Sequence, residues 1–138
     1  VSVADSTSPT VAVLEFTGLG TDRHTAEWTA RGLTELIATK LTAETYGAPP
    51  PGVRRIGEGL KSAFWVEGAV LCTEGRLSIV ARILEVDREV YVWRAQYVAE
   101  NEDVLLFLDA SAEQIARATL ETVGRAQEAA SDERRNSQ

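Results

Sequence analysis

Apolar and polar positions alternate most densely in residues 64–97, FWVEGAVLCTEGRLSIVARILEVDREVYVWRAQY. A period of two residues is typical of β-strands with one buried face. Two polar breaks, at residues 74–75 and 87–89, divide the stretch into three runs of strand length. The pattern therefore predicts a three-stranded antiparallel meander, onto which the rest of the chain packs.

The two turns set the register of this meander. Gly75 can supply the positive φ that a two-residue hairpin loop at 74–75 requires. A three-residue loop at 87–89 places Trp93 beside Ile83, whereas a slip of one residue would place it beside an arginine. We therefore predict the three-residue loop. One face then carries the large apolar side chains, which are Val66, Val70, Ile79, Ile83, Trp93 and Tyr97.

Two longer stretches have the period of amphipathic helices and are predicted to cover that same face. The first spans residues 25–42 and contains Gly32, which costs about 1 kcal/mol relative to alanine, so it marks an irregular turn or lets the sheet approach closely. Its apolar positions are Trp28, Leu33, Leu36, Ile37 and Leu41. The second begins after the helix-starting residues Asn101, Glu102 and Asp103. Its helical positions are Val104, Leu105, Leu108, Ala112, Ile115, Ala116, Thr119, Leu120 and Val123.

The remaining patterns complete the predicted fold. Residues 11–16, VAVLEF, suit a strand, and residues 53–60 suit a short helix although two glycines weaken it. We expect a two-layer α/β (α+β) domain with about four strands, the amino-terminal strand and the meander, in a mixed sheet. Two long helices pack on one face, and one short helix is added. The domain occupies residues 11–124, between a flexible lead at 1–10 and a polar tail at 125–138 that frays.

Charge and length limit the classes of partner. The chain has 138 residues, with 21 acidic and 14 basic side chains and a net charge of −7. This charge opposes binding to nucleic acid or to an anionic membrane surface. The apolar runs are too short to cross a bilayer, so contact with a membrane is expected only through a tether or a partner. The single cysteine, Cys72, cannot form an intramolecular disulfide.

The few residues suited to catalysis do not converge. His24 lies next to charged residues before a helix, where a surface or capping role is preferred to that of a general base. Cys72 falls on the predicted core face and is expected to be a small buried side chain, not a reactive thiolate. Gly18 and Gly20 only partly match a dinucleotide-binding loop, since the third glycine is absent. We therefore predict no catalytic, cofactor or metal site, and no enzyme activity.

The other face of the meander is the candidate interaction site. A solvent-facing sheet surface is usually more polar than this one. Either residues 53–60 and the prolines before them cover it, or it docks a protein partner, a neighbouring domain or a second copy. The candidate partner-binding residues are Trp65, Glu67, Leu71, Val80, Arg82, Leu84, Val92 and Arg94.

Four segments resemble the TolB amino-terminal-like domain, the α/β module that accompanies tetratricopeptide repeats in bacterial adenylate-cyclase-like regulators and is related to a flagellar assembly lipoprotein domain. They are VAVLEF, GLTELI, FWVEGAV and the stretch from RLSIVARILEV through VYVWRAQY to EDVLLFLDASAEQIARATL. In the last, the family commonly has its RL, W, Y, D and F at positions occupied here by Arg76, Leu77, Trp93, Tyr97, Asp103 and Phe107. Two features depart from the family: the strand after the first helix is expected to be missing, and Glu89 replaces a hairpin glycine.

The resemblance implies a noncatalytic module that binds protein partners on the extracytoplasmic (periplasmic) side of a bacterial membrane. Our first hypothesis is an accessory or scaffold subunit of a membrane-associated assembly, tethered through its amino-terminal lead. The alternative is a small-molecule or anion sensor that binds between residues 18–22 and the first helix, where free backbone N–H groups favour an anion. The identity of the partner and the oligomeric state stay open.

Overall fold

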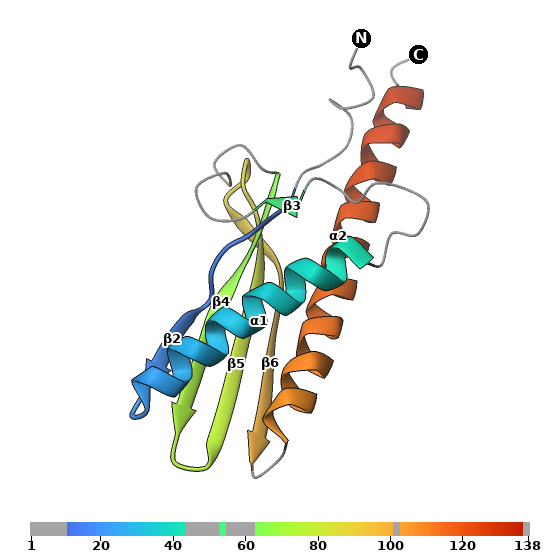
Figure 1. Ribbon diagram of the computed structural model, residues 1–138. Helices are drawn as coiled ribbons and strands as arrows, with labels where there is room; N and C mark the ends of the chain where they lie inside the picture. Colours follow the sequence, from blue (N-terminus) through green and yellow to red (C-terminus); the bar gives the residue numbers. More distant parts are fainter. Residues whose placement is uncertain (1–10, 44–52, 55–62, 101–102, 137–138) are drawn as a thin grey trace.

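The computed structural model describes residues 11–43, 53–54, 63–100 and 103–136. These residues form two layers, a mixed sheet and two helices on one face of it (Figure 1). The strands are β1 (Val11–Val13), β2 (Thr17–Gly20), β3 (Val53–Arg54), β4 (Phe64–Thr73), β5 (Arg76–Glu85) and β6 (Val90–Glu100). The helices are α1 (Arg23–Ala43) and α2 (Val104–Asn136).

The sheet is wider than the predicted four strands. Its order is β3-β1-β4-β5-β6, and β2 pairs with β4 beyond the end of β1. The added strand is β3, whose Val53 lies opposite Val11 in parallel. Two residues that were assigned to a short helix are therefore a strand, and a strand after α1 is present after all. The rest of that predicted helix, residues 55–60, lies outside the described residues.

The predicted first strand, residues 11–16, is shorter than expected, and a second strand that was not predicted follows it. β1 ends at Val13, and β2 begins at Thr17, with one more residue between them than the facing part of β4 has. At the break, the buried N–H of Phe16 donates to Thr34 Oγ1 of α1 at 2.9 Å. The Thr34 hydroxyl thus takes the place of a backbone acceptor on a neighbouring strand. The buried N–H at the break therefore keeps a hydrogen bond inside the core. Gly18 and Gly20, expected in a loop, lie in β2.

The predicted register of the meander is confirmed over most of its length. Val66 lies opposite Ile83, and Ile83 opposite Trp93. Between Ile83 and Leu84 the β5–β6 register shifts by one residue, so Leu84 faces Tyr91 where Val92 was expected. The shift lengthens the turn to residues 86–89.

The core lies between one sheet face and the two helices, as predicted. Val66, Val70, Ile79 and Ile83 have no exposed surface, while Trp93 and Tyr97 of β6 contact the core and stay half-buried. Cys72 is buried with them. The two helices are joined by an ion pair of 2.9 Å between Lys40 Nζ and Asp109 Oδ1.

Two details of α1 differ from the prediction. Trp28, assigned to the apolar stripe, is 63% exposed. Gly32 has no neighbour within 4 Å of the place where a Cβ would be, so it neither marks an irregular turn nor permits a close approach. The close approach is at Gly18 in β2, where a Cβ would lie 2.4 Å from the backbone nitrogen of Glu27.

α2 begins where the sequence predicted and ends later. Asp103 Oδ1 accepts from the N–H groups of Leu105 at 2.9 Å and Leu106 at 3.3 Å, which is helix capping. Leu105, assigned to the buried face, is 67% exposed. The residues expected to fray after Gly124 continue the helix to Asn136. No helix within the described residues is both long enough and apolar enough to span a membrane.

Candidate partner-binding face

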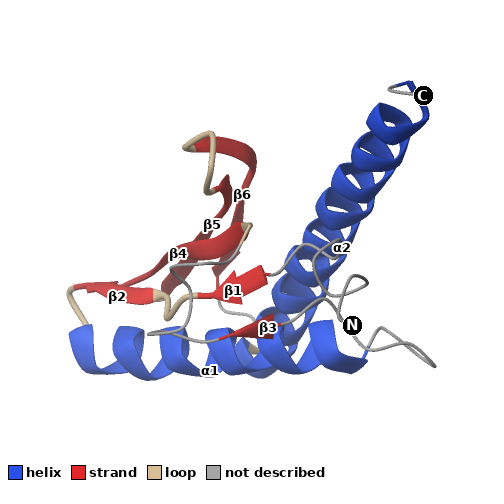
Figure 2. Ribbon diagram, turned by 90° about the horizontal axis from the view of Figure 1, so that it is seen from above, coloured by secondary structure: helices blue, strands red, loops and turns tan. Residues whose placement is uncertain are grey.

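The reverse face is the sheet surface that points away from α1 and α2, and Figure 2 shows both helices on the opposite side. Strand pairing arranges its side chains in rows. Glu67, Arg82 and Arg94 form one row across β4, β5 and β6. Trp65, Leu84 and Tyr91 form the adjacent row. The structure thus brings six of these side chains, from three strands, onto one continuous surface.

Tyr91 is the centre of the polar part of this face. Its hydroxyl donates to Glu67 Oε1 at 2.8 Å. The guanidinium carbons of Arg82 and Arg94 lie 5.1 and 5.8 Å from the centre of its ring, within the range of cation–π contacts. Arg82 Nη2 also lies 3.6 Å from Glu67 Oε1. The group therefore holds two cations and one carboxylate, a local excess of positive charge in an acidic chain.

The two arginines are incompletely paired. Among the described residues, the buried Nε of Arg82 has no hydrogen-bond partner. Arg94 likewise has no carboxylate within ion-pair distance in the described part of the chain, and its guanidinium contacts the ring of Tyr91. A carboxylate from outside the domain could pair with Arg94, which is exposed.

The hydrogen bond to Glu67 also governs the titration of Tyr91. It raises the pKa of the Tyr91 hydroxyl above 10.0, with the negative charge of Glu67 acting in the same direction. The hydroxyl is therefore a donor throughout the physiological pH range. The pKa of Tyr97, on the helix face, is raised as well because burial disfavours its phenolate.

An apolar band lies next to the polar group. Leu19, Leu71 and Val98 share a row that crosses β2, β4, β5 and β6, with Ser78 between the last two. Each of the three is exposed by more than 40%, and Val80 in the next row is 39% exposed. Several large apolar side chains on one exposed sheet face are typical of a protein-binding surface.

The structure confirms the placement of most predicted site residues on this face. Val92 is the exception, because the register shift leaves it without a partner and gives its place to Tyr91. Sequence reasoning also missed Leu19 and Val98. Val98 could have been found, since the register that was predicted for β6 already puts it beside Ser78.

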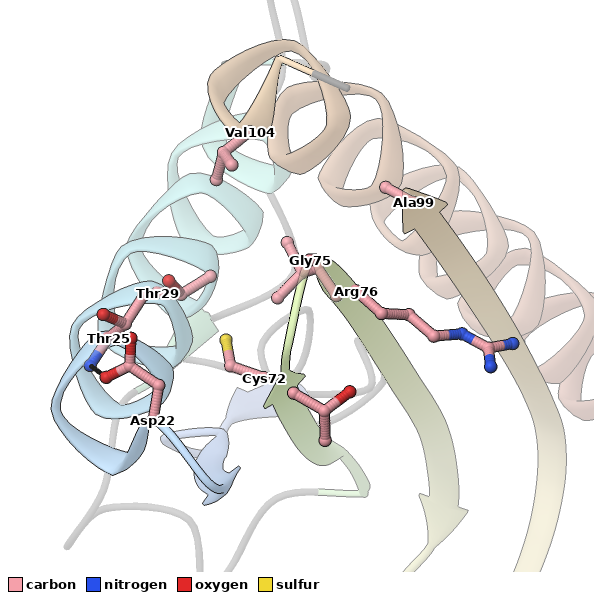
Figure 3. Close-up of a pocket in the computed structure, with 10 residues that line it drawn as sticks. Asp22, Thr25, Thr29, Cys72, Gly75, Arg76, Ala99 and Val104 are labelled. Atoms are coloured by element: carbon pink, nitrogen blue, oxygen red, sulfur yellow. Dashed lines mark hydrogen bonds between the residues drawn. The ribbon is translucent and has the colours of Figure 1, made fainter. Parts of the chain in front are cut away.

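A second candidate is a cavity of about 300 Å³ at the amino-terminal end of α1, near the site proposed for an anion. Figure 3 shows Asp22, Thr25 and Thr29 of the α1 end on one side and Cys72 pointing inward. Asp22 Oδ1 accepts from the Thr25 N–H at 3.2 Å. This helix terminus is therefore already capped by a carboxylate.

The cavity is lined by charged groups of both signs, Asp22 and Arg76. Hydrogen bonds from Thr25 hold the pKa of Asp22 below 3.8, so the carboxylate is charged at neutral pH. Burial, and secondarily the charge of Asp22, raise the pKa of the Cys72 thiol. An anionic ligand would meet the charge of Asp22, while the cation in the lining, Arg76, is already paired with Glu100 at 3.5 Å. Cys72 is a thiol, not a nucleophilic thiolate.

Other chemistry has little support in the described residues. His24 is exposed in the first turn of α1. Among the side chains that the structure describes, no three His, Cys, Asp or Glu residues are grouped so that they could hold a metal ion. The expectation that the chain is not an enzyme stays a prediction.

No protein-family model and no curated protein matches the sequence. Solved structures match it in fold. PelC from Paraburkholderia phytofirmans, solved as a dodecamer, is 13% identical with a TM-score of 0.57, over 79% of this chain and 86% of PelC. TolB from Acinetobacter baumannii is 11% identical with a TM-score of 0.54, over 83% of this chain and 28% of TolB. At these identities the likeness establishes a shared fold, and it agrees with the TolB-like architecture expected from the sequence.

Proposed function

We propose that the chain is a noncatalytic protein-interaction domain, an accessory or scaffold subunit of a bacterial membrane-associated assembly on the extracytoplasmic side. The observation that carries this proposal is the reverse face, where exposed apolar residues adjoin two incompletely paired arginines. Its partner is a protein, because a broad band of apolar side chains suits another folded surface better than a small ligand.

The comparisons add support of a general kind. PelC, which shares the fold, forms a dodecamer, so this architecture occurs in a subunit of a larger assembly. The extracytoplasmic location is carried by the resemblance to the TolB amino-terminal-like domain. Contact with a membrane then comes through a tether or through the partner.

The test is site-specific photo-crosslinking in the bacterium that encodes the chain. A photoreactive residue at Leu71 or Val80 should give discrete adducts with another protein, whereas the same residue at Glu27, exposed on α1, should not. Val80→Glu should abolish the Leu71 adduct because it buries a charge in the apolar band. Adducts from Glu27 alone would refute the assignment of the interface to this face.

Trp65→Ala and Arg82→Glu are also expected to weaken binding. Arg82 contacts both Glu67 and Tyr91, so its replacement disturbs the face as well as the partner. Val80→Glu is the cleaner variant, since Val80 is exposed and lies outside that group.

A further inference from the structure

β6 is an edge strand suited to pairing with another chain. It ends the strand order of the sheet, and among the described residues its outer side receives no backbone hydrogen bond. In an antiparallel strand, alternate residues direct N–H and C=O groups to the same neighbour, so half of these groups on β6 point away from β5. The strand has 11 residues, VYVWRAQYVAE, without the proline or lysine that commonly protects edges.

The charges on the reverse face show what the edge lacks. Arg94 on β6 lies opposite Arg82 on β5, and like charges in this position repel each other. Glu67 on β4 offsets the charge of Arg82 from one side. On the other side of Arg94 is the open edge, where an acidic residue on an added strand would offset the second positive charge.

The chain contains such a residue on β6 itself. Glu100 lies six residues after Arg94, and an even separation puts both side chains on the same sheet face. If two β6 strands pair antiparallel about a two-fold axis at Tyr97, Arg94 of each copy lies opposite Glu100 of the other. We propose that two copies of this chain associate through β6 in this register and form one continuous sheet. The pairing does not depend on the proposed function.

The register centred on Tyr97 also gives favourable neighbours to Glu100 and to Tyr97 itself. Glu100 is already close to Arg76, with Arg76 Nε and Glu100 Oε1 3.5 Å apart. The row across both copies would therefore begin with Glu67, Arg82 and Arg94 and continue with Glu100 and Arg76 of the second copy. On the helix face Tyr97 would meet its own symmetry mate, an aromatic cross-strand pair, and Tyr97 is only half-buried in one copy.

Neither neighbouring register places Arg94 opposite Glu100. With the axis at Gln96, Arg94 would lie opposite Val98 and Glu100 opposite Val92. With the axis at Val98, Glu100 would lie opposite Gln96, and Arg94 would lie beyond the last residue of β6. Of these three registers, the one centred on Tyr97 pairs each Arg94 with an acid of β6, and it does so twice by symmetry.

The test is sedimentation equilibrium on the full chain, from micromolar concentrations up to about 1 mM. We expect a dimer whose dissociation constant rises about tenfold or more in Arg94→Glu and in Glu100→Arg, because each change places like charges opposite one another at two sites. The double variant, which exchanges the charges, should return to within about threefold of the unmodified chain. Arg125→Glu, an equal change of charge at an exposed position on α2, should have no effect.

Three results would overturn the proposal: a monomer at about 1 mM, a dimer that neither single variant weakens, or single variants that the double variant does not rescue. The third result is also the one expected if the β6 edge pairs with an acidic strand of another protein. Hydrogen exchange on the unmodified chain adds a test that needs no substitution. Amides of β6 should gain protection as concentration rises, and a gain confined to the helices would contradict pairing through this edge.

Discussion

Glu89 adopts a left-handed backbone conformation, with a φ of 54°, in the turn between β5 and β6. An L-residue in this conformation costs roughly 1 kcal/mol relative to glycine. The turn imposes it, because the Glu89 N–H donates to Val86 O at 3.2 Å while Glu85 and Val90 pair directly before and after the turn. The family glycine that this chain lacks would fit this position without strain.

Glu89→Gly should therefore raise the free energy of unfolding by about 1 kcal/mol, measured by urea denaturation. Glu74→Gly is the matched control, since Glu74 lies in the β4–β5 turn and does not have a positive φ. That control should lower stability by roughly 0.5 to 1 kcal/mol, because glycine increases the entropy of the unfolded chain. Equal changes in the two variants would contradict the assignment of strain to Glu89.

The hydrogen bond between the Tyr91 hydroxyl and Glu67 predicts that the stability of the fold decreases at high pH. Since the pKa of Tyr91 is raised in the folded protein, the bond contributes its full stability below pH 10.0 and loses it as the pH rises through the folded value. Glu67→Gln should shift the Tyr91 titration to lower pH. The measurement is phenolate absorbance, with Tyr91→Phe identifying the signal. An unchanged titration in Glu67→Gln would show that Glu67 is not the cause.

At the level of elements, side-chain periodicity predicted the strands and their faces but not their irregularities. The register shift in β6 was missed because Tyr91 and Val92 are both apolar, so either could face Leu84 without changing the pattern. β3 has two residues, too few for any period. β2 was missed because it contains Gly18 and Gly20, which favour a loop in isolation and are needed here for close packing.

The candidate partner-binding residues were predicted from the same alternation of apolar and polar positions. Seven of the eight residues were placed correctly on the reverse face because alternation fixes the face of a strand. Tyr91 was missed with the register shift and Leu19 with β2. The anion site suggested at the start of the first helix stays a hypothesis. The pattern located a helix terminus but could not show that the Asp22 carboxylate caps it.

The packing of α1 on β2 gives a prediction at this scale. Gly32→Ala should raise the free energy of unfolding by about 1 kcal/mol, because the added methyl group meets nothing within 4 Å and alanine favours the helix. Gly18→Ala should instead cost more than about 1 kcal/mol, since its methyl group would overlap the backbone of Glu27 and push α1 away. Thermal unfolding of both variants is the measurement, and destabilisation by Gly32→Ala would contradict the prediction.

For the molecule as a whole, α2 is longer than the sheet it covers. Its 33 residues extend about 50 Å at 1.5 Å per residue, whereas the 10 residues of β4 extend about 33 Å. The carboxy-terminal part of α2 projects past the sheet in Figure 1. The last buried residue on this helix is Val123, the half-buried Ala126 still packs against the core, and every described side chain from Gln127 onward is exposed.

The domain should therefore fold without its last turns. A chain that ends at Ala126 should keep its free energy of unfolding within about 0.5 kcal/mol, because it removes no core contact. A chain that ends at Glu121 also loses Val123 and should be less stable by about 1.5 to 3 kcal/mol. Urea denaturation of both chains measures the difference. If the longer chain were also strongly destabilised, the projecting turns would have to contact the domain, and residues 125–138 would belong to it as a structural part.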